Sequence, residues 1–262
     1  MLEYIKNLAV AAGKLALAEQ AVLAADAVHT KATAKDIVTD ADRKVEDFIV
    51  TMLKREFPDF AIFGEESGKS GQESDYCWVI DPIDGTAGFA RKLPNWCVSI
   101  GLVHKGESIL GAIYAPVKNE LYYAEKGKGS FLNGIRMHVS SVSDLESSIV
   151  VTGLGCLRAN WKEENNLKYI SRIAPLVGDL RKYGSAALDC CRIAHGVLDA
   201  YWELLLQPYD IAAGDIIARE AGAVITDFYG GADYPERGFL CTNQALHKTM
   251  LEFFSDYKNL RR

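Results

Sequence analysis

Apolar residues at the start of the chain recur with helical spacing. The pattern runs through residues 2–28 and indicates an amphipathic helix. A polar segment at 29–35 predicts a loop, and a second helical pattern follows it. Thr39 or Asp40 is suited to cap the start of this second helix, and Pro58 closes it. We therefore expect two long helices near the N-terminus.

Short apolar runs separated by turn residues occupy the next part of the chain. Runs at 61–63 and 76–80 indicate two strands. Beyond them, four segments of alternating character are joined by turns that contain glycine or asparagine. We expect these segments to form an antiparallel meander with strands at 97–104, 108–115, 121–125 and 130–132.

From about residue 148, strand and helix patterns alternate, which is typical of layered α/β packing. The predicted strands lie at 148–152, 180–183, 200–205, 223–226 and 238–241, and the predicted helices lie at 163–176, 185–195, 211–221 and 243–254. No repeat or flexible linker interrupts the pattern. We therefore expect one domain over residues 1–262, with subdomains of approximately 1–145 and 146–262.

Composition narrows the class of protein. Of the 262 residues, 49% are apolar and 24% are charged, which suits a globular domain with a sizeable core. The net charge is -6 and no basic block stands out, so we expect no nucleic-acid partner. No apolar run approaches the ~18 residues of a membrane span, so we expect no membrane partner.

Cysteine usage and the N-terminus point to a reducing compartment. The six cysteines form no C-x-x-C pair, and in a chain of this length they are expected to be reduced and mostly buried. The N-terminus lacks the basic start and the unbroken apolar stretch of a signal peptide. The sequence therefore predicts a cytoplasmic protein.

Several common catalytic motifs are absent from the sequence. There is no H-x-x-x-H pair for zinc, no G-x-S-x-G elbow and no G-x-G-x-x-G after a strand. The run G-E-E-S-G-K-S at 64–70 resembles a phosphate-binding loop but is one residue short of it. Glu65 and Glu66 would repel phosphate in that loop unless a cation lay between them. A nucleotide-binding loop is therefore not expected.

Carboxylates follow two predicted strands. Glu65 and Glu66 come after the strand at 61–63, and Asp81 ends the strand at 76–80. Asp84 follows one tight turn later, with the Ile83 carbonyl between the two aspartates. A set of oxygen ligands of this kind suits magnesium, calcium or manganese. Taken alone, D-P-I-D-G-T is equally consistent with a solvated acidic turn, and the second strand end favours the metal site.

Three stretches of the chain resemble the signatures of the inositol monophosphatase family. They are G-E-E-S at 64–67, W-V-I-D-P-I-D-G-T at 78–86 and P-Y-D-I-A-A-G at 208–214, within a resemblance that extends over 39–227. This family belongs to a lithium-sensitive, magnesium-dependent phosphatase superfamily that includes fructose-1,6-bisphosphatases. The resemblance implies a five-layer α-β-α-β-α sandwich, a homodimer, and a small phosphate ester as the substrate.

The resemblance also implies a set of metal ligands. Glu65, Asp81 and the Ile83 carbonyl would hold a first Mg²⁺, and Asp81, Asp84 and Asp210 would hold a second, with a looser third ion near Glu65. Mn²⁺ is expected to be able to substitute for Mg²⁺. Asp210 opens the predicted helix at 211–221, where a carboxylate is favourable, and the alternative for this residue is a plain helix cap.

By the same resemblance, other residues receive catalytic and substrate-binding roles. Thr86, with Asp42 behind it, would orient the attacking water and help to deprotonate it. We expect the catalytic set to be Thr86, Asp42, Glu65 and Asp81, and the substrate-binding set to be Asp84, Gly85, Thr86, Gly184, Ser185, Ala186, Glu203, Asp210 and Lys31. Four of these residues have simpler alternatives: Asp42 a first-turn acid, Lys31 a surface lysine, Ser185 a helix N-cap, and Glu203 a solvent-facing strand residue.

The expected activity is the hydrolysis of inositol 1-phosphate. Alternatives are fructose 1,6-bisphosphate, a 3′-phosphoadenosine nucleotide, histidinol phosphate, or a non-catalytic regulatory protein on the same fold. The absence of a charged residue after D-G-T favours inositol or sugar phosphates over nucleotides. Two departures from the family pattern leave the substrate open: Gly88 stands where many relatives carry asparagine, and Tyr209 stands where tryptophan is usual.

Overall fold

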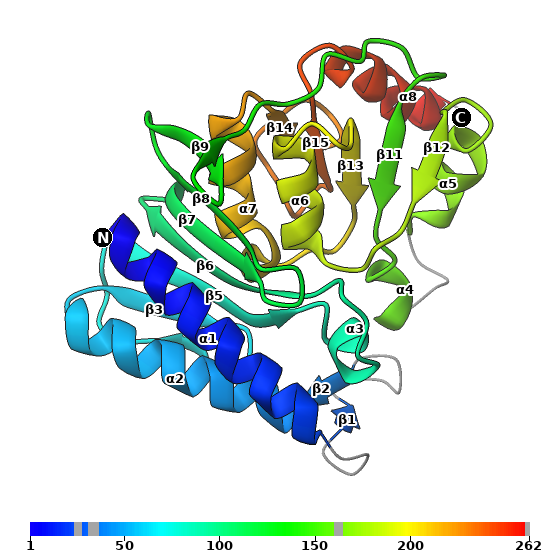
Figure 1. Cartoon of the computed structure of the whole chain (residues 1–262). Coiled ribbons are helices and arrows are strands. Elements are labelled where there is room, and N and C mark those ends of the chain that lie inside the picture. The colour runs from blue at the N-terminus through cyan, green and yellow to red at the C-terminus, as the bar shows by residue number, and fades with distance from the viewer. Residues whose placement is uncertain (24–27, 31–36, 160–164, 260–262) are drawn as a thin grey trace.

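The first layer of the molecule is a pair of helices near the N-terminus. The structure is a computed structural model and describes residues 1–23, 28–30, 37–159 and 165–259. Helices α1 (Leu2–Val22) and α2 (Asp40–Glu56) lie side by side on one face of a large sheet (Figure 1). α2 starts with a capping box in which Asp42 accepts the Thr39 amide. The two predicted helices are confirmed.

The segment between these helices differs from the prediction. The backbone is already extended at Leu23, so the helix predicted over 2–28 is too long. Strands β1 (Val28–Thr30) and β2 (Ile37–Thr39) pair in antiparallel orientation, so the loop predicted over 29–35 is wrong at residues 29 and 30. β-branched residues in both strands suit a ladder.

The large sheet has eight strands in the order β10-β9-β8-β7-β6-β5-β3-β4. Neighbouring strands are antiparallel except β3 and β5, which are parallel. The predicted meander is confirmed, whereas β4 and β10 were not expected. The strands are β3 (Ala61–Gly64), β4 (Gly68–Ser70), β5 (Tyr76–Asp84), β6 (Cys97–His104), β7 (Glu107–Ala115), β8 (Glu120–Glu125), β9 (Gly129–Leu132) and β10 (Ile135–Arg136).

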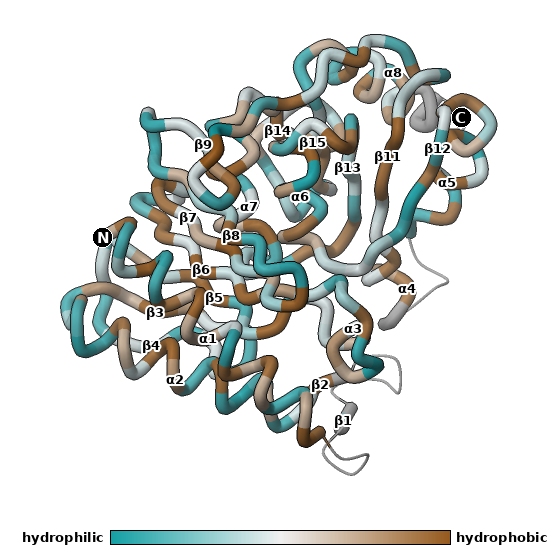
Figure 2. Tube along the Cα trace, in the orientation of Figure 1, coloured by the Kyte–Doolittle hydropathy of each residue, from teal (hydrophilic) through white to brown (hydrophobic). Residues whose placement is uncertain are grey.

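The second sheet has five strands in the order β12-β11-β13-β15-β14. β11 is parallel to both of its neighbours, and the other two pairs are antiparallel. Figure 2 shows hydrophobic residues along β11, inside this sheet. Its strands are β11 (Ile149–Thr152), β12 (Asp179–Arg181), β13 (Ala200–Glu203), β14 (Val224–Thr226) and β15 (Phe239–Thr242).

Two helices fill the space between the sheets, and two more cover the outside of the second sheet. α6 (Ala186–Ala194) and α7 (Pro208–Glu220) form the central layer, and α5 (Leu167–Ile173) and α8 (His247–Asn259) form the outer one (Figure 1). Separate apolar clusters fill the four interfaces between successive layers. The expected α-β-α-β-α sandwich is therefore confirmed. None of the described helices is both long enough and apolar enough to cross a bilayer.

Some element boundaries in the C-terminal part differ from the prediction. α5 is shorter than the helix predicted over 163–176, of which residues 163 and 164 lie outside the described residues. α8 begins at His247 instead of residue 243, because the Asn243 side chain donates to Ser140 Oγ and to the Val142 carbonyl and accepts the Leu246 amide. A short helix, α4 (Cys156–Ala159), lies in a segment for which no element was predicted.

Candidate active site

Two parallel strands bring the first carboxylates together. In the register of β3 and β5, Gly64 lies beside Ile80. The next amide, that of Glu65, donates to the Ile80 carbonyl over 3.1 Å. Glu65 follows the last residue of β3 and lies close to Asp81 within the neighbouring strand β5, so the charge of Glu65 acts on Asp81. The expected approach of the two residues is confirmed, but the strand predicted over 76–80 is too short. β5 continues to Asp84, and an irregularity in its pairing with β6 between Asp81 and Asp84 replaces the predicted tight turn.

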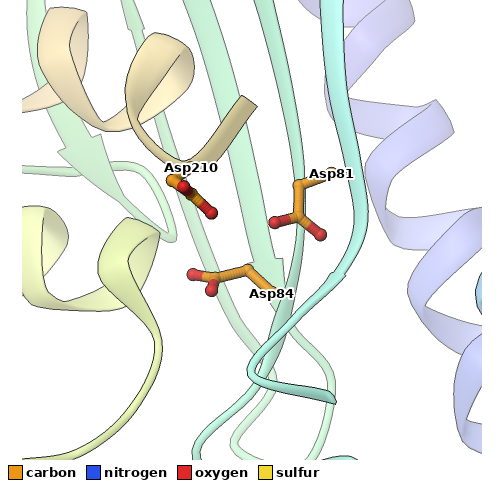
Figure 3. Close-up of side chains that lie close together, drawn as sticks. All are labelled: Asp81, Asp84 and Asp210. Carbon is orange, nitrogen blue, oxygen red and sulfur yellow. The ribbon is translucent and has the colours of Figure 1, made fainter. Parts of the chain in front are cut away.

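A third segment completes an acidic cluster. Each of Asp81, Asp84 and Asp210 offers one carboxylate oxygen, and the three oxygens lie within 4.8 Å of one another. Figure 3 shows the carboxylates of the two β5 residues and of the α7 residue directed into a common space. Asp81 and Asp84 are buried and Asp210 is partly exposed. Among the described residues, no Lys or Arg forms an ion pair with any of the three.

The cluster is electrostatically unfavourable without a cation. Burial raises the pKa of Asp81 well above its ordinary value, and the charges of Glu65, Asp84 and Asp210 raise it further. Burial, followed by the charge of Asp84, likewise raises the pKa of Asp210. Three hard oxygen donors within 4.8 Å of one another fit a divalent cation such as Mg²⁺. The donor set therefore fits the kind of ion that the sequence predicts.

Asp84 is held by the central helix layer. Its Oδ2 atom accepts hydrogen bonds from Ser185 Oγ (2.6 Å) and from the Ala187 amide (2.8 Å). Burial raises the pKa of Asp84 to about 6, and these two hydrogen bonds limit the rise. Because both donors reach Oδ2, the Oδ1 atom of Asp84 stays available to the cluster.

The last residues of β5 and the turn that follows them have a specific backbone. Ile83 donates its amide to Asp81 Oδ1 (3.0 Å). Gly85 has φ 97°, and a Cβ at this position would lie 2.7 Å from the Asn95 carbonyl oxygen. Only glycine satisfies both conditions. The turn leads into a short helix, α3 (Thr86–Ala90), so the backbone amides expected to meet phosphate lie at a helix start.

The Thr86 hydroxyl contacts Asp42, which lies in the first turn of α2. Its Oγ1 lies 3.3 Å from Asp42 Oδ1 and 3.0 Å from the Ile83 carbonyl oxygen, so one hydroxyl proton has two acceptors. Asp42 Oδ2 accepts hydrogen bonds from the Thr39 amide and hydroxyl. Burial raises the pKa of Asp42 to about 7, the Thr39 hydrogen bonds oppose the rise, and the charge of Glu65 adds to it. Asp42 is thus both the first-turn acid of α2 and the partner of Thr86.

On the opposite side of the cluster, α6 starts at Ser185. The Ser185 hydroxyl accepts the Leu188 amide as the N-cap of α6 and also donates to Asp84. The helix-cap alternative is therefore correct and is combined with a contact to the acidic cluster. Gly184 precedes it with φ 92°, and Ala186 is buried in the first turn.

Glu203 is not the solvent-facing strand residue of the simpler alternative. It is buried at the end of β13, with 7% of its surface exposed. Its carboxylate accepts the Gly155 amide (3.0 Å) and the Tyr201 hydroxyl (2.8 Å). A Cβ on Gly153 would lie 1.7 Å from Glu203 Oε2. Two glycines and a buried tyrosine therefore fix this carboxylate.

Three further positions singled out in the sequence are Lys31, Tyr209 and Gly88. Lys31 lies outside the described residues. Tyr209 packs edge-on against Phe63, with ring centroids 5.7 Å apart. A Cβ on Gly88 would lie 3.1 Å from the Asn95 carbonyl oxygen, so this position is tight. No role was predicted for Glu46, although it lies one helical turn after Asp42 in α2.

The chain belongs to the inositol monophosphatase family, whose sequence profile matches residues 1–259, and it is a phosphomonoester hydrolase. An inositol-1-monophosphatase of Synechocystis is 38% identical over 249 residues, which cover 90% of this chain and 86% of the relative. A Nus factor SuhB of Vibrio cholerae is 39% identical over 210 residues, which cover 80% of this chain and 78% of that protein.

Solved structures agree with this assignment. An inositol monophosphatase from Anabaena superposes with a TM-score of 0.87 at 33% identity, over 97% of this chain and 95% of the other. An IMPase from Thermotoga maritima gives a TM-score of 0.87 at 34% identity, over 97% and 96% of the two chains. The fold and the family are thus supported by sequence and by structure.

Proposed function

We propose that the protein is a Mg²⁺-dependent inositol-1-phosphate phosphatase. The observation that carries the proposal is the convergence of the Asp81, Asp84 and Asp210 carboxylates, whose oxygens lie within 4.8 Å of one another. The inositol-1-monophosphatase of Synechocystis supports the substrate. Crowding three carboxylates together, two of them buried, costs free energy that a bound cation would offset, which argues against a purely regulatory protein.

The residues that would hold the metal are those that the sequence predicts. Glu65, Asp81 and the Ile83 carbonyl would bind one Mg²⁺, and Asp81, Asp84 and Asp210 would bind another. When bound, Mg²⁺ would supply positive charge against phosphate oxygens and lower the pKa of a coordinated water. Mn²⁺ has the same preference for oxygen ligands and would substitute for it.

Thr86 and Asp42 would handle the proton of the attacking water. The Thr86 oxygen accepts a proton from water while its own proton passes to Asp42 Oδ1, 3.3 Å away. A carboxyl group with a pKa of about 7 is well matched to accepting a proton near neutral pH. The amides of Gly85 and Thr86, at the start of α3, would meet phosphate oxygens. By the family resemblance, Lys31 would also contact the phosphate.

The alcohol side of the substrate would lie toward α6 and β13. Gly184, Ser185 and Ala186 begin α6, and Glu203 ends β13. The fixed carboxylate of Glu203 would accept a hydrogen bond from a ring hydroxyl, which suits a polyol such as inositol. Asp84 would contribute its Oδ1 atom on the same side.

A panel of phosphate esters tests the proposal. Purified protein is assayed for phosphate release from myo-inositol 1-phosphate, fructose 1,6-bisphosphate, 3′-phosphoadenosine 5′-phosphate and histidinol phosphate. We expect the highest kcat/KM for myo-inositol 1-phosphate, and we expect activity to disappear in EDTA and return with Mg²⁺. A higher kcat/KM for another ester would show that this ester, and not inositol 1-phosphate, is the preferred substrate. Turnover without metal would overturn the metal site.

From family membership we also propose a cytoplasmic homodimer that Li⁺ inhibits. Light scattering coupled to size exclusion measures the mass directly, and the mass of one chain, 28.8 kDa, would contradict the dimer. A Li⁺ titration of the same assay measures inhibition.

A further inference from the structure

Helix α2 carries a second buried carboxylate one turn after Asp42. Glu46 has only 1% of its surface exposed. Among the described residues, no Lys or Arg forms an ion pair with it. Instead its carboxylate accepts two backbone amides, from Glu66 (2.9 Å) and from Ser67 (2.7 Å). A buried anion is costly unless hydrogen bonds satisfy it, so these two contacts define its environment.

The glycine before the metal-binding turn matches this carboxylate. A Cβ on Gly64 would lie 2.5 Å from Glu46 Oε1 and 2.7 Å from Oε2. Any side chain at position 64 would therefore push the Glu46 carboxylate away from the turn. The first glycine of G-E-E-S leaves the space in which Glu46 approaches the backbone.

Three consecutive amides of the turn thus have fixed acceptors. Glu65 donates to the Ile80 carbonyl, and Glu66 and Ser67 donate to Glu46. Glu65 is the first residue of this restrained segment. The Glu65 side chain lies close enough to Asp81 to raise its pKa, which burial already raises, and these three amide contacts restrain the backbone from which it extends.

We propose that Glu46 is a positioning residue that holds the turn 64–67 so that Glu65 is pre-arranged to bind the metal. This inference rests on the proposed metal-dependent function. On this view, α2 aligns two parts of the site from one helix face: Thr86 through Asp42, and Glu65 through Glu46. Preorganised ligands bind a cation more tightly because less ordering is needed on binding.

Elsewhere in the fold, Glu220 offers a matched control. Its carboxylate accepts the amides of Gly127 (2.7 Å) and Gly129 (2.7 Å) in the turn between β8 and β9, which carries no residue of the acidic cluster. Glutamine has one acceptor oxygen, so Glu46→Gln and Glu220→Gln each leave one amide without its partner. The two variants remove the same type of hydrogen bond at two turns.

Isothermal titration calorimetry with Mg²⁺ measures metal binding independently of turnover, and thermal melting in EDTA measures the stability of the metal-free protein. We expect Glu46→Gln to weaken Mg²⁺ binding about tenfold, the scale of one lost hydrogen bond to a charged group. The apparent Mg²⁺ activation constant should rise by the same factor, while KM at saturating Mg²⁺ stays within about twofold. Glu220→Gln should leave Mg²⁺ binding unchanged while lowering the melting temperature.

Each outcome has a distinct meaning. Unchanged Mg²⁺ binding by folded Glu46→Gln would overturn the positioning role, and so would an equal loss of binding in Glu220→Gln. Wild-type protein that binds no Mg²⁺ would overturn the proposed function instead. If Glu46→Gln does not fold, Gly64→Ala tests the same contact, because its new Cβ displaces the carboxylate. This second variant should also weaken Mg²⁺ binding, and unchanged binding would overturn the proposal.

Discussion

At the scale of single residues, Asp81 and Asp84 differ although they lie three positions apart. Asp84 receives two hydrogen bonds from α6, and its pKa rises only to about 6. Asp81 receives the Ile83 amide, and its pKa is raised well above its ordinary value by burial and then by three neighbouring carboxylates. The chain thus stabilises the charge of Asp84 with two donors and that of Asp81 with one, so Asp81 depends more on a cation.

Asp81→Asn should therefore have opposite effects on activity and on stability. We expect kcat to fall at least ~10²-fold, the scale of losing one main electrostatic stabiliser. Without metal, the melting temperature should rise, because a neutral side chain ends the repulsion with Glu65, Asp84 and Asp210. Turnover is measured with Mg²⁺ and melting with EDTA. Near wild-type turnover would exclude this site.

Asp42 makes the stability of the metal-free protein depend on pH. Its pKa is raised from 3.8 to about 7 in the folded state, so between these values the folded state binds more protons than the unfolded state. Stability is then highest below the lower value and falls as pH rises toward 7, with a slope of up to about 1.4 kcal/mol per pH unit. Asp84 contributes with the same sign up to about pH 6.

We expect Asp42→Asn to reduce this fall in stability. Chemical denaturation in EDTA from pH 5 to 8 gives the free energy of unfolding at each pH, and the slope for the variant should be shallower than for the wild-type protein. Asp144, a fully exposed acid whose pKa is lowered, serves as the control position, and Asp144→Asn should not flatten the slope. Identical slopes for Asp42→Asn and wild type would show that Asp42 is already ionised in the folded protein.

At the scale of elements, the position of Asp210 depends on how closely α7 approaches the large sheet. Two central strands carry glycine under this helix: Gly101 in β6 and Gly111 in β7. A Cβ on Gly111 would lie 2.7 Å from the Ala213 carbonyl oxygen, and a Cβ on Gly101 would lie 2.9 Å from the Ala213 amide nitrogen. These contacts are to backbone, which cannot rotate away. The glycines therefore let α7 bring its first turn to the end of β5.

Gly111→Ala should move α7 away from the sheet. Overpacking of this kind costs about 1–3 kcal/mol of stability, and the shift of Asp210 should weaken Mg²⁺ binding as well. Thermal melting and Mg²⁺ calorimetry on the same preparation measure the two effects. A variant that loses stability but binds Mg²⁺ like wild type would show that α7 adjusts without moving its first turn.

At the scale of the whole molecule, the site lies where the two sheets meet through the central helices. Asp81 and Asp84 come from the first sheet, whereas Asp210, Ser185 and Glu203 come from the C-terminal half. A cation bound between these halves would tie them together. Metal binding should therefore raise the melting temperature of the complete fold, and its effect should not be confined to the local turn.

Mg²⁺ should raise the melting temperature of the wild-type protein. A ligand that binds only the folded state adds about 2.7 kcal/mol when its concentration is roughly 100 times its Kd. Asp210→Asn should lose most of this gain, and NaCl at matched ionic strength should not produce it. Differential scanning calorimetry provides the measurement, and an equal rise with NaCl would indicate general screening instead of a bound ion.

Local sequence was sufficient for much of this protein. The alternation of apolar residues predicted the meander, and helical spacing predicted α1, α2, α6 and α7, because periodicity reflects which face of an element is buried. Carboxylates placed after apolar runs predicted that Glu65 and Asp81 would meet, although only Glu65 follows the end of its strand and Asp81 lies within β5. The signature motifs added Asp84 and Asp210 to the same set.

Only the tertiary structure decided how these groups are held. The burial of Glu203 against Gly153, the double role of Ser185 and the contact of Glu46 with the turn after Gly64 all join segments distant in the sequence. Periodicity carries no information about such pairings, because they depend on which elements pack together and how closely. The sequence by itself determined the elements and the metal-binding residue types, and packing between layers determined their geometry.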